Sequence, residues 1–142
     1  YGGANVGLME ATAEHVKKHG GSITGIITHR ICDYGKASRL PDELIRVDTL
    51  GERKQMMLDK ADVFIALPGG FGTLDEIFTV IAAGHLGYHD KKVVFCNTNG
   101  FYNLLINQIE LFYRERFASP HYKNYYQIAT NAEECIRILE NF

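Results

Sequence analysis

Uninterrupted apolar runs alternate with amphipathic stretches along the chain. The runs at residues 22–28, 62–68 and 92–97 lack the polar–apolar alternation of a strand with one wet face. Strands that read in this way are buried on both faces, which is typical of parallel sheets covered by helices. Two shorter strands are predicted at residues 44–49 and 126–130.

Helix-like spacing fills the intervals between these strands. Val6, Met9, Ala13 and Val16 recur three and four residues apart, so they predict a helix that the following glycine pair ends. Further helices are predicted at residues 50–61, 73–86, 101–116 and 132–139. The polar, turn-rich residues 29–42 are predicted to form a long loop, and such loops often carry function.

This alternation predicts an α/β fold with a doubly wound, Rossmann-like parallel sheet, in which ligands bind beyond the carboxyl ends of the strands. The 142 residues suit a single domain, residues 1–142. The opening letters YGGANVG read as the end of a strand that enters a turn. We therefore expect the first strand to be missing from the chain and the domain to be incomplete at its N-terminus.

Net charge and the placement of the cysteines limit the classes of partner and the cellular location that we expect. A net charge of −2 provides no basic field, so neither nucleic acid nor a membrane surface is an expected partner. The longest apolar runs, about six residues, fall far short of the ~20 that a membrane-spanning helix needs. Cys32, Cys96 and Cys135 are scattered and form no C-x-x-C pair, which favours a reducing, cytoplasmic location over a disulfide framework or a zinc knuckle.

The segment VFIALPGGFGTLDEIF, residues 63–78, places a glycine-rich turn between a strand and a helix. Backbone N–H groups at a helix start lack intrahelical partners, and glycines let an anion approach them closely. Gly69, Gly70, Gly72 and Thr73 therefore suggest a phosphate cradle, although a turn of this kind also serves packing alone. The turn at Gly2 and its neighbouring glycines allows the same two interpretations.

Charged residues beside these turns are candidates for chemistry. Glu76 completes a capping box with Thr73, or it works on a substrate beside the anion site. Asp75 is interpreted as a solvated first-turn acid. Arg53 and Lys54 read as the wet face of a helix, unless a phosphate site converges on the planar fork of Arg53.

The sequence gives little support for a metal site or for a catalytic triad. The pairs His15/His19 and His85/His89 have the i,i+4 spacing of metal ligands, but no third ligand is evident. No Ser-His-Asp or Cys-His arrangement can be argued. We expect no metal and no cofactor.

Four segments resemble the "lonely guy" (LOG) family in order and spacing: YGGANVGLMEATA, GERKQMM, LPGGFGTLDEIF and GHLGYHDKKVV. LOG proteins are cytokinin riboside 5′-monophosphate phosphoribohydrolases, long described as lysine decarboxylases. The resemblance covers essentially the whole chain, and the pairing of R-K with P-G-G-x-G-T-x-x-E is its most specific part.

The resemblance implies a nucleotide-binding, Rossmann-like homodimer that serves cytokinin biosynthesis or nucleotide salvage. It would cleave the N-glycosidic bond of a nucleoside 5′-monophosphate, such as cytokinin riboside monophosphate or AMP, to free base and ribose 5-phosphate. The family's catalytic residues fall on Arg53 and Glu76. Its substrate- and phosphate-binding residues fall on Gly2, Gly3, Met9, Lys54, Pro68, Gly69, Gly70, Gly72 and Thr73.

Several positions depart from the family pattern. Ala4 and Glu10 stand where the family usually has glycine, and Ala83 and His85 replace its Trp and Gln. The last two lie near the helix that the family uses in its pocket and dimer contact, so they bear on base specificity.

Two other functions fit the sequence less well. Lysine decarboxylation normally needs an electron sink such as pyridoxal phosphate, and no segment argues for one. A non-catalytic carrier of a phosphorylated ligand, similar to molybdenum-cofactor carriers, would keep the glycine turn but would not need both Arg53 and Glu76. The presence of both favours the enzyme.

Overall fold

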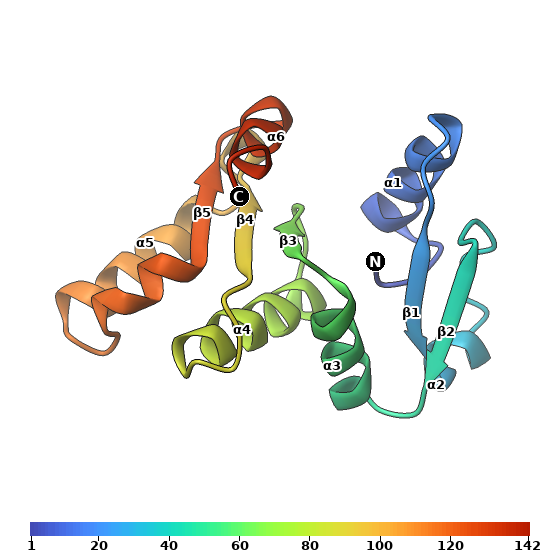
Figure 1. Cartoon of the computed structure of the whole chain (residues 1–142), viewed down its shortest axis with the longest axis horizontal. Helices are drawn as coiled ribbons and strands as arrows, with labels where there is room; N and C mark the ends of the chain where they lie inside the picture. The colour runs from blue at the N-terminus through green and yellow to red at the C-terminus, as the bar shows by residue number, and fades with distance from the viewer. The chain divides into compact units, whose positions relative to one another are not determined.

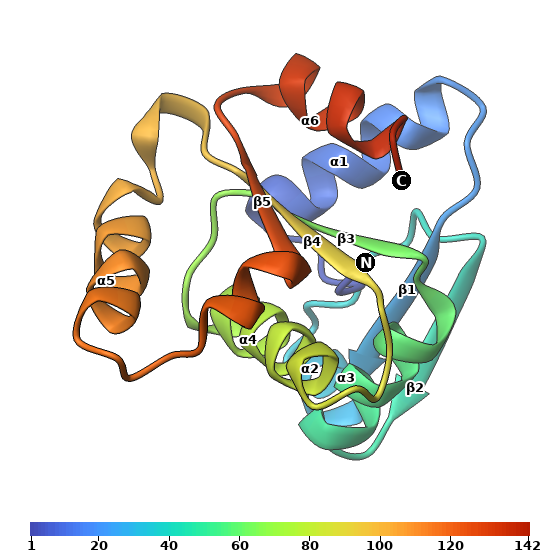
Figure 2. The same cartoon turned by 60° about the vertical axis from the view of Figure 1, so that its left-hand side comes forward.

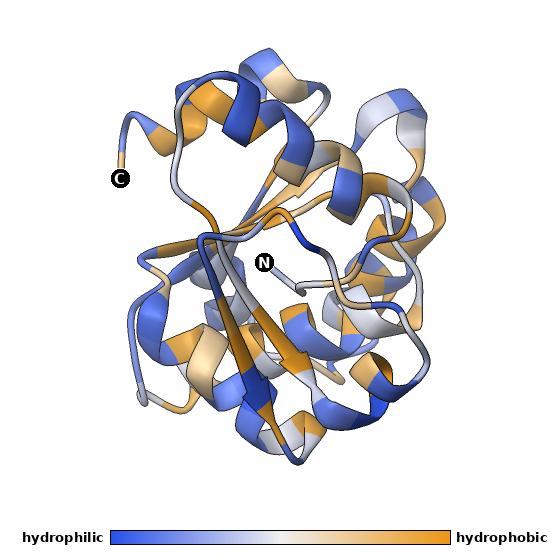
Figure 3. Cartoon of the chain, turned by 90° about the vertical axis from the view of Figure 1, so that its right-hand side faces the viewer, coloured by the Kyte–Doolittle hydropathy of each residue, from blue (hydrophilic) through white to orange (hydrophobic).

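A computed structural model describes all residues, 1–142. The chain forms two compact units, Tyr1–Ala61 and Asp62–Phe142. Each unit consists of helices and parallel strands (Figure 1), which confirms the predicted α/β class. The helices of both units carry hydrophobic and hydrophilic stretches side by side (Figure 3), as amphipathic helices do when one face packs on a sheet. None of the helices is both long and apolar enough to cross a bilayer.

The first unit has a two-stranded parallel sheet with three helices. Its elements in chain order are α1 (Gly7–Lys18), β1 (Thr24–Thr28), α2 (His29–Asp33), β2 (Glu43–Val47) and α3 (Leu50–Lys60). Ile26 of β1 lies opposite Ile45 of β2. Tyr1 bonds along β1, because its amino group donates to Thr24 O and its carbonyl accepts from Ile26 N, both at 2.9 Å. These two bonds hold the opening residue beside β1.

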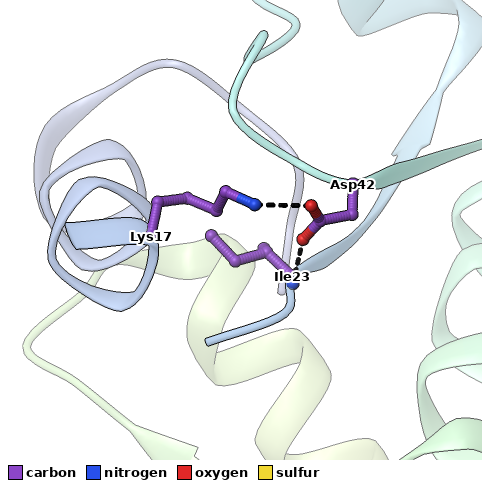
Figure 4. A network of polar contacts seen from close by, with 3 residues as sticks. All are labelled: Lys17, Ile23 and Asp42. Carbon is purple, nitrogen blue, oxygen red and sulfur yellow. Dashed lines mark hydrogen bonds and ion pairs between the residues drawn. The ribbon is translucent and has the colours of Figure 1, made fainter. Parts of the chain in front are cut away.

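An exposed ion pair joins α1 to the segment before β2 (Figure 4). Lys17 Nζ donates to one carboxylate oxygen of Asp42, and the Ile23 amide donates to the other at 2.8 Å. The Lys17 hydrogen bond, followed by that from Ile23, holds the pKa of the Asp42 carboxyl below its ordinary value. One carboxylate therefore fixes both the end of α1 and the entry to β1.

The predicted loop at residues 29–42 is more ordered than expected. It opens with the short helix α2, and its second half bonds to the glycine turn near the N-terminus. The Asn5 amide donates to Lys36 O at 2.8 Å, and the Ser38 amide donates to Gly3 O at 2.9 Å. A five-residue helix is too short to show helical periodicity in a sequence, which is why it was missed.

The second unit has a three-stranded parallel sheet in the order β3–β4–β5. Its elements in chain order are β3 (Val63–Ala66), α4 (Phe71–His85), β4 (Lys92–Cys96), the 3₁₀ turn η1 (Thr98–Gly100), α5 (Asn103–Arg114), the 3₁₀ turn η2 (Pro120–Tyr125), β5 (Tyr126–Ala129) and α6 (Ala132–Leu139). In Figures 1 and 2, α6 lies above the three strands and α4 below them. The core of the unit is the central strand β4, in which Val93, Val94, Phe95 and Cys96 are buried.

Strand β3 is not buried on both faces, as its apolar run predicted. Phe64 and Ala66 are buried, but Ile65, which alternates to the other face, is 46% exposed. The strand pairs only with β4 and so forms an edge of this sheet. An unbroken apolar run therefore did not distinguish this strand from one that is covered on both faces.

The two histidine pairs do not behave as helical metal pairs. Helix α4 ends at His85, and Gly87 takes a positive φ of 81°, so His89 lies beyond the helix. The His85 ring stacks on Tyr122 of η2 with centroids 3.8 Å apart. In α1, His15 Nδ1 bonds to Ala11 O, and His19 Nδ1 bonds to His15 O. The structure has no cluster of three or more metal-ligating side chains.

His89 should make stability fall on acidification. Burial, followed by the charge of Lys91, lowers the pKa of His89, and its Nδ1 accepts from the Lys91 amide at 3.1 Å. Because the folded state resists protonation, stability is full above the unfolded pKa of about 6.5 and is lost as pH falls below it. We expect the melting temperature to drop more between pH 7.5 and 5.5 in the wild type than in His89→Gln. The exposed His19→Gln serves as control, and equal drops in all three proteins would contradict this expectation.

Candidate active site

The glycine-rich turn of the second unit leads directly from β3 into α4. The helix begins at Phe71 with Gly70 as N-cap, two residues earlier than predicted, and no side chain caps it. The first intrahelical bond runs from the Leu74 amide to Gly70 O at 3.1 Å. The amides of the first turn therefore have no intrahelical acceptor, and the helix dipole adds partial positive charge there. This is the geometry in which a helix start accepts a phosphate.

Gly69 is required by its contact with Thr73. A Cβ on Gly69 would lie 2.2 Å from Thr73 Oγ1, so the threonine side chain lies against the glycine backbone. Gly70 and Gly72 meet no such obstacle and leave open space where a Cβ would stand. Two roles follow from the one pattern: Gly69 lets Thr73 pack, and Gly70 and Gly72 leave room beside the first turn.

Glu76 is not part of a capping box. A box would need Thr73 at the N-cap, but Thr73 is the third residue of α4 and Glu76 the sixth. The chain does have a complete capping box, at Thr49 and Glu52 at the start of α3, which the sequence analysis missed. Glu76 is half-buried and lies one helical turn beyond Gly72 and Thr73 on the same face. Because Cα–Cβ bonds tilt toward a helix N-terminus, the Cβ of Glu76 points toward the side of the glycine turn.

Arg53 lies in the first unit and is buried, with 8% of the residue exposed. Its Nε donates to Ile26 O at 2.8 Å, and its Nη2 approaches Gly2 O at 3.5 Å. It is therefore not part of the wet face of α3, which was the alternative interpretation. Lys54, the next residue, is half-buried.

Gly2 and Met9, two other predicted site residues, gather around Arg53. A Cβ on Gly2 would lie 2.6 Å from Arg53 Nη2 and 2.8 Å from Met9 Sδ. Gly3 takes a positive φ of 70°, which favours glycine, and a Cβ there would crowd Leu44 and β1. The first unit thus brings Gly2, Met9 and Arg53 together, while the second brings Gly69, Thr73 and Glu76 to one end of α4.

Tyr102 supports the glycine turn and was not predicted. Its hydroxyl donates to Leu67 O at 2.5 Å, one residue before Pro68. Burial raises the pKa of the Tyr102 hydroxyl. A hydrogen bond with the backbone of Gly69 offsets part of this rise by lowering the pKa. The only sequence signal was indirect, because Tyr102 shortly follows Asn97, a polar residue where β4 ends.

An apolar cavity of about 270 Å³ lies elsewhere in the second unit. It is lined by residues of α4, α5, η2 and the segment before it, and β5: Phe78, Ile81, Ala82, Ile109, Phe112, Tyr113, Phe117, Ala118, Tyr122 and Tyr126. None of the predicted site residues borders it. The candidate site therefore rests on the glycine turn and not on this cavity.

Parallel strands with helices between them, and a glycine-rich turn at the carboxyl end of a strand, define an α/β protein of the Rossmann-like class. A family model described as "Possible lysine decarboxylase" matches residues 9–139, and the chain belongs to that family. This confirms the resemblance to the LOG proteins.

Similar proteins carry the corresponding names. The chain is 39% identical over its full length to cytokinin riboside 5′-monophosphate phosphoribohydrolase LOG5 of Arabidopsis thaliana, and 34% identical to the probable phosphoribohydrolase LOGL9 of Oryza sativa subsp. japonica. It spans 62% and 63% of the lengths of those two proteins. Among solved structures, a molybdenum cofactor binding protein from Rippkaea orientalis matches with a TM-score of 0.71 and 28% identity. That match covers 99% of this chain and 74% of the other.

Proposed function

We propose that the protein hydrolyses the N-glycosidic bond of a nucleoside 5′-monophosphate, giving free base and ribose 5-phosphate. The observation that carries the proposal is the start of α4, where a glycine turn without a side-chain cap is followed one turn later by Glu76. The names of the relatives support this activity and a cytokinin riboside monophosphate as the proposed substrate. AMP is the other substrate that the family resemblance implies.

The 5′-phosphate is proposed to bind the backbone amides of residues 69–73, with the Thr73 hydroxyl as a further donor. A phosphate there complements both the unbonded amides and the helix dipole. Anchoring one end of the substrate leaves the ribose within reach of the next turn of α4, where Glu76 stands.

Glu76 is proposed to act on the bond itself. As the bond between C1′ and the base nitrogen breaks, its electron pair leaves with the base and positive charge builds on the ribose ring. A carboxylate stabilises that charge, and it can take a proton from the water whose oxygen bonds to C1′. The base leaves with a proton, so water is the only co-reactant.

Arg53 and Lys54 are proposed to take part in the same reaction. This assignment rests on the family resemblance, and the tethering of Arg53 to two backbone carbonyls supports a fixed orientation for its guanidinium. We also propose that residues 1–142 belong to one nucleotide-binding domain, because the family model runs through both units. The free thiols of all three cysteines suit the cytoplasm as its location.

The test is to incubate the full-length protein with a panel of nucleoside 5′-monophosphates and to measure free base and ribose 5-phosphate in equal amounts. The alternative function, a carrier of a phosphorylated ligand, is favoured by the structural likeness to a molybdenum cofactor binding protein. A carrier would bind a ligand from the panel or the cofactor itself without releasing base. Binding with no release from any member would overturn the proposed reaction.

We further propose a homodimer formed through α4 and residues 86–89. The stretch FTVIAAG of α4 is apolar nearly all round, and Leu86 and Tyr88 beyond the helix are 69% and 79% exposed. Light scattering at micromolar concentration should give twice the chain mass, and Leu86→Glu should give monomer. Leu104→Glu serves as control, because Leu104 of α5 is even more exposed, at 85%. A wild type that scatters as a monomer would refute the dimer.

A further inference from the structure

Tyr102 is held in place on all sides within the second unit. Its ring packs edge-on against Phe95, with centroids 5.4 Å apart, and against Phe101, with centroids 4.9 Å apart. Its amide donates to Asn97 Oδ1 at 2.7 Å, and the residue as a whole is only 2% exposed. The hydroxyl therefore has one position, and that position faces Leu67 O.

Asn97 extends this arrangement across the sheet. Its amide donates to Ala129 O at 2.7 Å, and its side-chain Nδ2 donates to Asn103 Oδ1 at 2.8 Å. The end of β4, the end of β5 and the start of α5 are thus bonded to the segment that carries Tyr102. A movement of the hydroxyl would require several of these bonds to break together.

The segment that Tyr102 contacts has few restraints of its own. Pro68 has no N–H group, and the glycines at 69 and 70 have the widest conformational freedom of any residue. A hydroxyl bonded to the Leu67 carbonyl fixes the peptide plane and occupies the acceptor.

We propose that Tyr102 is a positioning residue for the phosphate-binding turn: it holds the backbone of residues 67–69, so that the amides that follow in the turn and the first turn of α4 face the ligand. This role rests on the proposed function, because it assumes that the turn binds a phosphate. Tyr102 touches neither the phosphate nor the reacting atoms and acts through the Leu67 carbonyl.

The test uses Tyr102→Phe, which keeps the ring packing and removes only the hydroxyl. Two quantities are measured in the full-length protein: binding of ribose 5-phosphate by calorimetry, and the kinetics of nucleoside monophosphate hydrolysis. Loss of one hydrogen bond should weaken ribose 5-phosphate binding roughly 2- to 10-fold. KM should rise by a similar factor with kcat nearly unchanged, because the phosphate contacts are the same in ground and transition states.

Tyr126→Phe is the matched control, since the Tyr126 hydroxyl is also part-buried and bonds to the Tyr113 hydroxyl at 3.0 Å, on another element of the same unit. Both variants should melt at lower temperature, but only Tyr102→Phe should bind ribose 5-phosphate more weakly. If Tyr102→Phe melts lower and binds normally, the residue is structural only and the inference is wrong. A wild type that binds ribose 5-phosphate in a Tyr102-dependent way but releases no base would overturn the proposed reaction and leave this role intact.

Discussion

Glu76→Gln should lower the turnover of a nucleoside 5′-monophosphate by at least ~10²-fold, the low end for a positioned acid or base. That factor corresponds to about 2.7 kcal/mol of lost transition-state stabilisation. Glutamine has the same shape but cannot take a proton from water, and it offers no full negative charge to an oxocarbenium-like ring. We expect the fold and the affinity for ribose 5-phosphate to persist, because glutamine is nearly isosteric with glutamate and the phosphate is proposed to bind the glycine turn.

The structure removes the principal alternative for this residue. A capping role would have predicted a loss of about 1 kcal/mol in helix stability with turnover intact. Since Gly70 and not Thr73 is the N-cap, Glu76 has no such role to lose. Asp75→Asn, which removes the neighbouring exposed acid from the same helical turn, should change turnover by no more than about twofold. If Glu76→Gln turns over at near wild-type rate, the proposed mechanism is wrong.

Arg53→Ala should reduce both turnover and stability. Turnover is expected to fall about as far as in Glu76→Gln, on the family's assignment of this arginine. The free energy of unfolding should fall by about 1–3 kcal/mol, because the carbonyls of Ile26 and Gly2 lose their buried donor. Chemical denaturation and steady-state kinetics on the same preparation measure the two effects.

Arg53→Lys separates charge from geometry. A lysine keeps the positive charge but has no planar fork to reach two carbonyls at once, so it should recover little of either property. Lys60→Ala removes an exposed cation of the same helix, one that pairs with Glu43 at 3.9 Å, and should shift stability by less than about 0.5 kcal/mol. Full activity and stability in Arg53→Lys would show that neither role needs the guanidinium.

The hydrophobic periodicity of the sequence was sufficient to predict the type and position of most helices and strands. Helix α6 runs from Ala132 to Leu139 as predicted, and α3 begins at Leu50 as predicted. The start of α4 was predicted two residues too late, because Thr73 resembles an N-cap. The N-cap in the structure is Gly70, which has no side chain that could signal a cap in the sequence. Glycine can begin a helix without the hydrogen bond on which sequence reading relies.

Only part of the candidate site could be predicted, because a sequence pattern reveals contacts between residues that are near one another in the chain. Gly69 and Glu76 lie within one short motif, so their spacing is visible in the sequence. Tyr102 is 35 residues from the carbonyl it holds, and no local pattern connects the two positions. The hydrogen bond from Arg53 to the Ile26 carbonyl spans 27 residues, so no local pattern reveals it either. From the sequence alone, Arg53 therefore resembled an ordinary exposed charge on a helix.

The contact between Gly2 and Arg53 ties together two positions that lie 51 residues apart in the chain. Any side chain at position 2 would occupy the space of the guanidinium, and a residue shorter than arginine at position 53 would release that space. The two positions should therefore covary among homologous sequences. Glycine should persist wherever arginine does, and larger residues at position 2 should occur only where the arginine has been lost.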